Sequence, residues 1–521
     1  MNELQRLVVA ALSEAARSLD RNGSSEPFQF CCGKYNQMTI GRMQMMSSVQ
    51  TMVGNAQKTD SVTGARVADE RASRLFASMD QSKFSGRHAA LYATVIFFHF
   101  FDGFDVLMIG TVLPGVVATF KLTSVEAGML VSSVFFGMLV GAILITMLAD
   151  RIGRKNALFL AIGWYAVFSL VAMTATSYHE LLVIRLLEGL GLGAEVPLVF
   201  TYVVEFVPSR KRGFLAASSV FFWLTAGGVA SLTAILIVPL FTWRGMFGLG
   251  AIPAILLVVA WRYVPESIRY LVSRNKIDEA EVIVRRFSTV DLETVDPKIV
   301  ARQLPQNAVA ATTRFTNIFR GGYLRYTLTI WGVNFGSGMV FFGLSAWLPS
   351  IFIRMGYTMV HSFAFSGLIA TAGAVGCLCQ ALLLDIFGRR LTIGISFLIG
   401  GVAMLAWGGA TSIYTIMGLG ALTAFTGAGG VTGCIHTYNV ELYPTQNRAT
   451  GAGFATAWQR MGGIVAPMLL GVFLAGKLPL FTSFAFLSAI MIINGIVALT
   501  LLFETKGKSL EQIAAGITAN G

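Results

Sequence analysis

Two aspartates lie inside an otherwise apolar stretch, "FFHFFDGFDVLMIGTVLPG", which runs from Phe97 to Gly115. Burying a carboxylate among apolar side chains is costly, so such residues mark function by default. Asp102 and Asp105 are three residues apart, and on a helix they would share one face with Cβ atoms about 5–6 Å apart. Two carboxylates at that spacing titrate jointly. The pattern predicts a pair that holds one proton; the alternative for Asp102 is capping of a broken turn at Gly103.

Three further ionisable residues lie in apolar runs. Arg185 begins a glycine-rich stretch, and Glu195 lies nearly three helical turns later, so the two side chains share a similar face. We expect Glu195 to be a second proton site or a substrate contact; the alternative is a neutral glutamic acid buried against a backbone carbonyl. His99, one turn before Asp102, fits either the site or simple packing.

Aromatic and polar residues on the central apolar runs are the candidates for substrate contact. An aromatic ring stacks well on a planar ligand, and a guanidinium group binds a carboxylate with two hydrogen bonds. Arg460 and His436 are the stronger candidates, because each aromatic side chain alone is more typical of packing or of the membrane interface. Trp458 would point about 200° away from Arg460 around the helix, so only one of them can face a cavity squarely. The candidate set is Trp223, Trp331, Asn334, His436, Tyr438 and Arg460.

Long apolar segments would position these residues. Hydrophobic residues make up 55% of the 521 residues and charged residues only 13%, against about 25% in a typical soluble protein. The apolar runs are continuous and near the length of about 20 residues that a membrane-spanning helix needs, which argues against a β-barrel with its shorter, alternating strands. The sequence predicts an all-α polytopic membrane protein with twelve transmembrane helices, at 92–118, 127–149, 156–176, 180–206, 214–238, 244–264, 325–352, 362–384, 391–410, 413–442, 451–476 and 480–503.

Basic loops set the expected orientation. The segments "DRIGRK", "PSRKRG", "FGRR" and "TQNR" follow the second, fourth, eighth and tenth spans, and the opposite loops carry little charge. Under the positive-inside rule both termini are cytoplasmic, and we expect the cell inner membrane. The formal net charge of +12 is then a topology signal, so we expect no nucleic-acid partner. The expected parts are a largely disordered polar tail over 1–88, six-helix bundles over 89–264 and 323–504, a cytoplasmic linker over 265–322 and a cytoplasmic tail over 505–521.

An internal repeat divides the spans into two halves. The segment "ADRIGRK" (149–155) recurs as "LDIFGRR" (384–390), each after the second helix of its half. Likewise "EFVPSRKRG" (205–213) recurs as "ELYPTQNRATG" (441–451), each after the fourth helix. Two parallel six-helix halves with a basic linker between them are typical of a transporter.

These motifs resemble the major facilitator superfamily. The signature after its second helix is matched by Asp150, Arg151, Gly153, Arg154 and Lys155. Thr146 replaces the leading glycine of that signature, and Arg185 opens the glycine-rich signature of the fourth helix. The segments "DGFD" (102–105) and "GLSAWLP" (343–349) are similar to the aromatic acid:proton symporter branch, the metabolite:proton symporters. Glu195 departs from that branch, which has a small residue there.

The resemblance implies a mechanism. In sugar porters of the superfamily an aspartate of the first helix pairs with the arginine that Arg185 matches, which implies an Asp105–Arg185 pair here; the alternative is a permanent structural ion pair. Protonation of Asp105 would release Arg185 and permit the loaded carrier to rock. Charge-paired loops would gate the cytoplasmic face, with Glu205 and Arg212 as partners of the Asp150 loop. The implied gating residues are Asp150, Arg151, Arg154, Glu205, Arg212, Asp385, Arg389, Glu441 and Arg448.

We therefore expect a proton-coupled symporter, not an enzyme, that imports a small organic acid, of the aromatic class, by alternating access. A niacin, sugar, polyol or drug transporter of the same superfamily remains an alternative, and so does a non-transporting sensor on this fold. The chain has no GxxxxGK[ST] motif and no metal-ligand cluster in sequence, so we expect no cofactor and the proton gradient as driving force. The expected partners are the organic acid, protons and the lipid bilayer, with the protein acting as a monomer.

Overall fold

Helices account for the regular secondary structure of the described residues, which are 70–295, 318–319, 322–443, 448–508, 512–513 and 517 of the computed structural model. The first half holds α3 (Gly86–Phe120), α4 (Ser124–Ile152), α5 (Arg154–Ala172), α6 (Tyr178–Phe206), α7 (Ser209–Gly250) and α8 (Pro253–Tyr263). The short helices α9 (Ile268–Ser273) and α10 (Ile277–Phe287) follow. The second half holds α12 (Tyr323–Arg354), α13 (Met359–Phe387), α14 (Arg389–Gly408), α15 (Ile413–Thr423), the π-helical turn η2 (Ala424–Ala428), α16 (Thr432–Glu441), α17 (Arg448–Ala475) and α18 (Leu480–Leu501).

The long helices match the predicted spans. Within the described residues, ten stretches are long and apolar enough to cross a membrane. One of them, Ser209–Tyr263, joins α7 and α8 and contains two predicted spans, and the backbone breaks between these at Thr242, whose φ is 58°. The helix α6 is a further long helix that carries Arg185, Glu188 and Glu195. The expectation of an all-α membrane protein with twelve crossing segments is confirmed.

The predicted span 413–442 is not one regular helix. It is divided into α15, the turn η2 and α16. The glycine-rich segment "TGAGGVTG" (426–433) covers the end of η2 and the start of α16. Carbonyl groups freed by such a break must find partners inside a membrane. The amide of Gln380 supplies them, because its Nε2 donates to Phe425 O and to Thr426 O, each at 2.7 Å.

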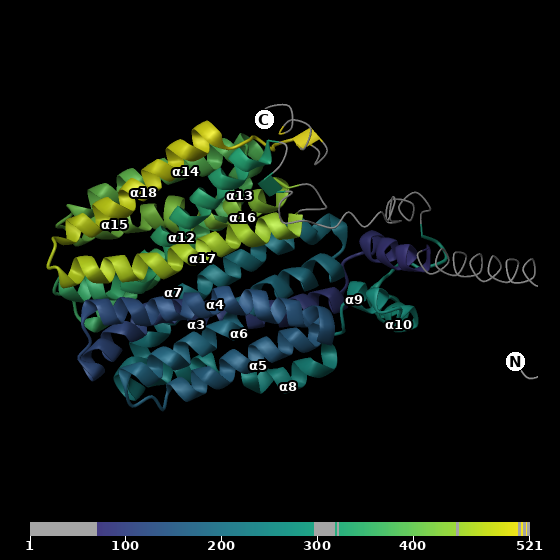
Figure 1. Ribbon diagram of the computed structural model, residues 1–521, viewed down its shortest axis with the longest axis horizontal. Helices are drawn as coiled ribbons and strands as arrows, with labels where there is room; N and C mark the ends of the chain where they lie inside the picture. The colour runs from purple at the N-terminus through teal and green to yellow at the C-terminus, as the bar shows by residue number, and fades with distance from the viewer. Residues whose placement is uncertain are drawn as a thin grey trace, which may run out of the picture. The chain divides into compact units, whose positions relative to one another are not determined.

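The two halves pack against each other as helical bundles. Figure 1 shows α3 to α6 and α8 together in blue and teal, and α12 to α18 together in green and yellow. Across the boundary α4 packs on α17, α7 on α13 and α3 on α12. Hydrogen bonds join the halves from Ser132 Oγ to Ile464 O at 2.6 Å and from Arg354 Nη2 to Ser124 Oγ at 2.9 Å.

The glycine-rich signature of α6 is a packing motif. A Cβ atom added at Gly189 would collide with the α4 backbone at Val134 and approach Gly137 Cα to 3.0 Å. Small residues let membrane helices approach closely. This contact fixes α6, and therefore its ionisable side chains, against the rest of the first half.

The expectation of a disordered tail over 1–88 is wrong for the part that the structure describes. Residues 72–81 are helical, and α3 already begins at Gly86. Leu75 and Met79 are buried, and Ser78 Oγ donates to Val290 O at 3.0 Å. The Ser78 hydroxyl, together with Ala77, which packs against Val295, therefore attaches this short helix outside the hydropathy spans to the segment after α10. Residues 1–69, 296–317 of the linker and most of 509–521 lie outside the described residues.

Candidate functional site

Asp105 belongs to a buried cluster with Arg185, Glu188 and Ser169, which we call the Arg185 cluster. Arg185 Nη1 lies 2.7 Å from Asp105 Oδ1 and 2.5 Å from Glu188 Oε2. Ser169 Oγ donates to Asp105 Oδ2 at 3.0 Å. All four side chains are fully buried, between α3, α5 and α6. The Asp105–Arg185 pair that the family resemblance implied is present as a contact.

Glu188 is the member of this cluster that the sequence reasoning missed. It lies three residues after Arg185 on α6, a spacing that brings side chains together on a helix and could have revealed it. Its presence changes the expected cycle. Protonation of Asp105 would leave Arg185 paired with Glu188, so the guanidinium group would not be released.

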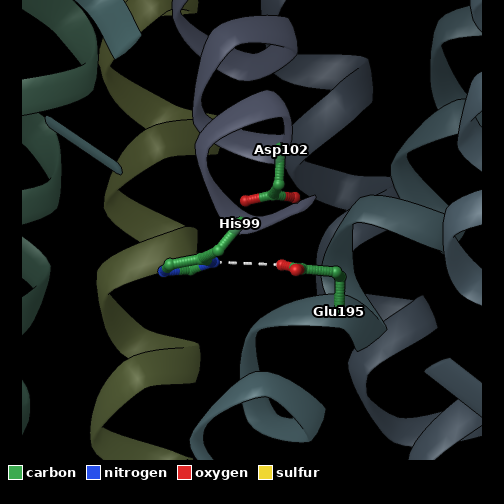
Figure 2. Close-up of side chains that lie close together, drawn as sticks. All are labelled: His99, Asp102 and Glu195. Carbon is green, nitrogen blue, oxygen red and sulfur yellow. Dashed lines mark hydrogen bonds and ion pairs between the residues drawn. The ribbon is translucent and has the colours of Figure 1, made fainter. Parts of the chain in front are cut away.

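Asp102 belongs to a second buried cluster, with His99 and Glu195, which we call the His99 cluster. His99 Nδ1 lies 3.1 Å from Glu195 Oε2, and ligand-type atoms of the three residues all lie within 4.8 Å of one another (Figure 2). Trp223 Nε1 donates to Asp102 Oδ2 at 2.6 Å. Asp102 Oδ1 and Glu195 Oε1 are buried without a hydrogen-bond partner. A nitrogen and carboxylate oxygens in this arrangement could hold a proton or another small cation.

The expected joint proton of Asp102 and Asp105 does not fit this geometry. Asp102 meets Trp223 and the His99 cluster, whereas Asp105 meets Arg185. The alternative of a cap at a broken turn is also absent, because α3 runs unbroken through Gly103.

Gly103 explains how α7 reaches Asp102. A Cβ atom at this position would lie 2.6 Å from Trp223 O and 3.0 Å from the Trp223 ring. Only a glycine lets the α7 backbone lie against α3 here. In the "DGFD" motif Gly103 lies between the two acids and lets α7 approach, so the Trp223 indole reaches Asp102.

Arg460 of α17 reaches across to the first half. Its Nη1 donates to Met138 O at 3.2 Å and its Nη2 donates to Gly193 O at 3.1 Å. The side chain is buried, and within the described residues it has no salt bridge to a carboxylate. Asp102 lies within electrostatic range of it. His436 of α16 lies within electrostatic range of Arg460 and of His99. His99, for which the sequence left both a site role and simple packing open, therefore belongs to the site.

The aromatic candidates divide into two groups. Trp223 packs against Phe341, with ring centroids 6.1 Å apart, and therefore lines the boundary between the halves. Trp331 stacks on Trp458 at 5.5 Å, and Trp458 is 37% exposed. Trp458 thus points away while Arg460 points inward, as the helical geometry predicted.

Two candidate contacts are engaged in structural hydrogen bonds instead. The amides of Asn334 and Asn439 bond each other, at 3.0 and 3.1 Å, and Asn334 also donates to Ile330 O. The Tyr438 hydroxyl donates to Phe503 O at 3.0 Å. Polar groups buried near the middle of a membrane need partners inside the protein. This requirement explains Asn334 and Tyr438 without a ligand, and their contact with substrate stays a prediction.

A largely apolar cavity lies between the halves beside Trp223. Its walls come from α3, α7, α12, α13 and η2. Leu107, Leu224 and Phe341 line it near Trp223, and Thr111, Ser231 and Ser345 provide hydroxyl groups. A largely apolar cavity with a few hydroxyl groups suits a small apolar or aromatic ligand, and its lining does not include Arg460, Asp102 or Trp223.

The gating residues of the first half pair differently from the prediction. Asp150 Oδ1 bonds Arg154 on its own loop at 2.8 Å. Glu205 accepts a hydrogen bond from Ser267 Oγ, and Arg212 pairs with Asp80 at 2.6 Å. The predicted contact of Arg212 with the Asp150 loop is therefore wrong, whereas Glu205 bonds Ser267 and also lies within electrostatic range of Arg154 of that loop. Arg212 pairs with Asp80 of the helix over 72–81, a helix that the hydropathy pattern did not predict.

The second half pairs its loop charges as the family resemblance implied. Arg389 Nη2 lies 2.7 Å from Glu441 Oε1, and Arg389 Nη1 lies 3.5 Å from Asp385 Oδ1. In the first half the Arg151 carbonyl accepts from Tyr270 and from Arg274. The Arg448 side chain lies outside the described residues.

Several known proteins resemble this chain in sequence and in fold. The family model "Sugar (and other) transporter" matches residues 28–516. The niacin transporter NiaP of Acinetobacter baylyi is 33% identical over 415 residues, which are 79% of this chain and 93% of the relative. The 4-hydroxybenzoate transporter PcaK of Pseudomonas putida is 30% identical over 373 residues, 70% of this chain and 82% of the relative.

The fold is also found among solved structures. The inward open conformation of the xylose transporter XylE from E. coli matches with a TM-score of 0.66 at 18% identity, covering 82% of this chain and 99% of that chain. With a family match over most of its length and the two-half bundle described above, the chain is a multi-pass membrane transporter and belongs to the sugar (and other) transporter family of the major facilitator superfamily.

Proposed function

We propose that this transporter is a symporter that imports a small aromatic carboxylic acid together with protons. The observation that carries the proposal is Arg460, a buried guanidinium group at the boundary between the halves that bonds backbone carbonyls and, within the described residues, no carboxylate. A buried cation of this kind is stabilised most by a bidentate carboxylate. A substrate carboxylate would supply that partner.

The aromatic class is supported by the relatives and by the cavity. Niacin and 4-hydroxybenzoate, the substrates in the names of two relatives, are flat rings that carry one carboxyl group. The Trp223 and Phe341 rings and the apolar cavity beside them offer a wall for such a ring. This supports a planar acid over a sugar, which would need many polar contacts.

Proton coupling is supported by the excess of buried acids. The two clusters contain Asp102, Asp105, Glu188 and Glu195, whereas Arg185 and Arg460 are the guanidinium groups beside them. Uncompensated charge is costly at this depth, so protons must neutralise the remaining carboxylates. We further propose that the carrier works as a monomer in the cell inner membrane with both termini cytoplasmic, as the basic loops predict.

A ligand screen on the purified protein in detergent tests the substrate class. Nicotinate, 4-hydroxybenzoate and benzoate should raise the unfolding temperature, because a ligand that binds only the folded state stabilises it. Nicotinamide and benzamide are matched controls that keep the ring and lack the negative charge, and they should have little effect. Stabilisation by xylose but by none of the acids would contradict the proposal.

A further inference from the structure

Two clusters of buried acids could each take the coupled proton, and the structure distinguishes between them. We infer that the proton that accompanies the substrate binds to the His99 cluster and not to the Arg185 cluster. This inference rests on the proposed function, because it assumes that a substrate carboxylate binds Arg460. The protons are assigned to Asp102 and Glu195, and His99 is the hydrogen-bond partner of Glu195.

The first step concerns the position of Arg460. Its Nη2 donates to Gly193 O, two residues before Glu195 on the same helix. The charged groups within electrostatic range of Asp102 include Glu195, His99 and Arg460. Arg460 therefore compensates the charge of Asp102 in the His99 cluster while the substrate is absent.

The second step is a count of charge. Without substrate, Asp102 and Glu195 would carry two negative charges against one positive charge on Arg460, so one proton makes the group neutral. When a substrate carboxylate binds Arg460, that positive charge is shared with the substrate, and the two acids need a second proton. Buried net charge is strongly disfavoured in a membrane. One additional proton should therefore enter with each monovalent substrate anion, and the step is electroneutral.

The third step concerns the surroundings of the cluster. Trp223 of α7 donates to Asp102, His436 of α16 lies within range of His99, and Tyr165 of α5 lies within range of Glu195. Indole and phenol groups are neutral at neutral pH, and a proton carried by His99 or His436 counts among the protons of the group. The charge count therefore holds with these neighbours included.

The Arg185 cluster has no such link to the substrate. Its cation, Arg185, is held by Asp105 and Glu188 at 2.7 and 2.5 Å. Both acids keep this partner whether or not Arg460 binds a carboxylate. Any proton that the cluster needs for neutrality is therefore resident and does not change with substrate binding.

The pH dependence of substrate affinity tests the assignment. In the wild-type protein the Kd for the acid that the screen identifies should rise about tenfold per pH unit on the alkaline side, as the uptake of one proton requires. In the double variant Asp102→Asn/Glu195→Gln the substrate carboxylate and Arg460 neutralise each other without a further proton, so the Kd should not depend on pH. Each single variant keeps one acid beside Arg460 and should keep the slope. Asp105→Asn is the control, and it should keep the slope as well.

A second measurement holds even where the double variant fails to fold. Adding substrate to wild-type protein in weakly buffered solution with a pH dye should take up about one proton per substrate bound, and Asp105→Asn should do the same. Loss of proton uptake in Asp105→Asn, or a pH-dependent Kd in the double variant, would overturn the assignment. Substrate binding that needs a divalent cation and is abolished by EDTA would also overturn it. If the wild type binds no aromatic acid at any pH, the proposed function itself has failed.

Discussion

Arg185 and Arg460 are both buried guanidinium groups, but their partners differ in kind. Arg185 has two carboxylates within its own half, whereas Arg460 contacts backbone carbonyls of the opposite half. A guanidinium group that bonds backbone carbonyls can exchange those bonds for bonds to a substrate carboxylate. A guanidinium group that already pairs with two carboxylates gains less from a third. This difference supports the proposal that Arg460, and not Arg185, binds the ligand.

The ligand role of Arg460 predicts the effect of two substitutions. Arg460→Lys keeps the charge but loses the second hydrogen bond, so the Kd for the acid should rise roughly tenfold. Arg460→Gln removes the charge and should weaken binding roughly 30-fold or more. Equilibrium binding of labelled substrate measures both. Arg354→Lys is the control, because Arg354 lies at the same boundary but bonds Ser124 Oγ. Unchanged affinity in both Arg460 variants would show that the ligand is anchored elsewhere.

The Arg185 cluster predicts a pattern of stability. Asp105→Asn leaves Glu188 as a partner and should be tolerated. Asp105→Asn/Glu188→Gln leaves a buried guanidinium group without an acid and should destabilise the protein by about 3–5 kcal/mol. Adding Arg185→Met to that double variant removes the unpaired charge and should restore stability. Thermal unfolding in detergent compares the three, and a double variant as stable as the single one would contradict the role of Glu188.

At the element scale, the contact of α3 with α7 depends on one glycine. Gly103→Ala would place a methyl group 2.6 Å from Trp223 O, so α7 must move and the Trp223–Asp102 hydrogen bond must stretch. Overpacking of this kind costs about 1–3 kcal/mol. Transport should be lost even where folded protein is recovered. Gly332→Ala on α12 is the control, because nothing lies within 4 Å of an added Cβ there. Normal transport by Gly103→Ala would mean that this contact is not required.

The helix over 72–81 is predicted to be part of the folded protein. Leu75 is 2% exposed, so Leu75→Ala should destabilise the protein by about 2–5 kcal/mol. The exposed residue Lys83 provides the control, and Lys83→Ala should have little effect. The yield of monodisperse protein after extraction from the membrane and its unfolding temperature report the difference. If Leu75→Ala behaves like Lys83→Ala, this helix is dispensable.

Sequence predicted the elements better than their contacts. Hydropathy alone located the twelve spans, because membrane burial imposes one pattern on every crossing helix. It did not locate η2, whose freed carbonyls are satisfied by Gln380 from another helix, or the helix over 72–81. Family resemblance implied the Asp105–Arg185 contact but not Glu188. The separation of Asp102 from Asp105 depends on which neighbouring helix each side chain meets, and spacing along one helix cannot give that.

At the scale of the whole transporter, the contacts between the halves are unevenly distributed. The bonds of Ser124 and Ser132 lie near the start of α4. The charged loops lie at the opposite end, at Gly153 after α4 and at Gly388 after α13. In the described part of the chain, no hydrogen bond or ion pair joins the halves between Arg460 and those loops. The loop charges instead pair within their own half, as Arg389 does with Glu441. The bonds of Ser124 and Ser132 hold the halves together at the end of α4 that is remote from Gly153.

Uptake into proteoliposomes under an imposed pH gradient tests symport of an aromatic acid most directly. Purified protein is reconstituted, the outside is made more acidic than the inside, and labelled nicotinate and 4-hydroxybenzoate are supplied. Liposomes without protein correct for passive entry of the neutral acid, and vesicles with equal pH on both sides are the matched control. We expect at least one of the two acids to accumulate above its outside concentration, and a protonophore to abolish the accumulation. Protein-dependent uptake that never exceeds equilibration, or that is the same with and without the gradient, would contradict proton-coupled transport.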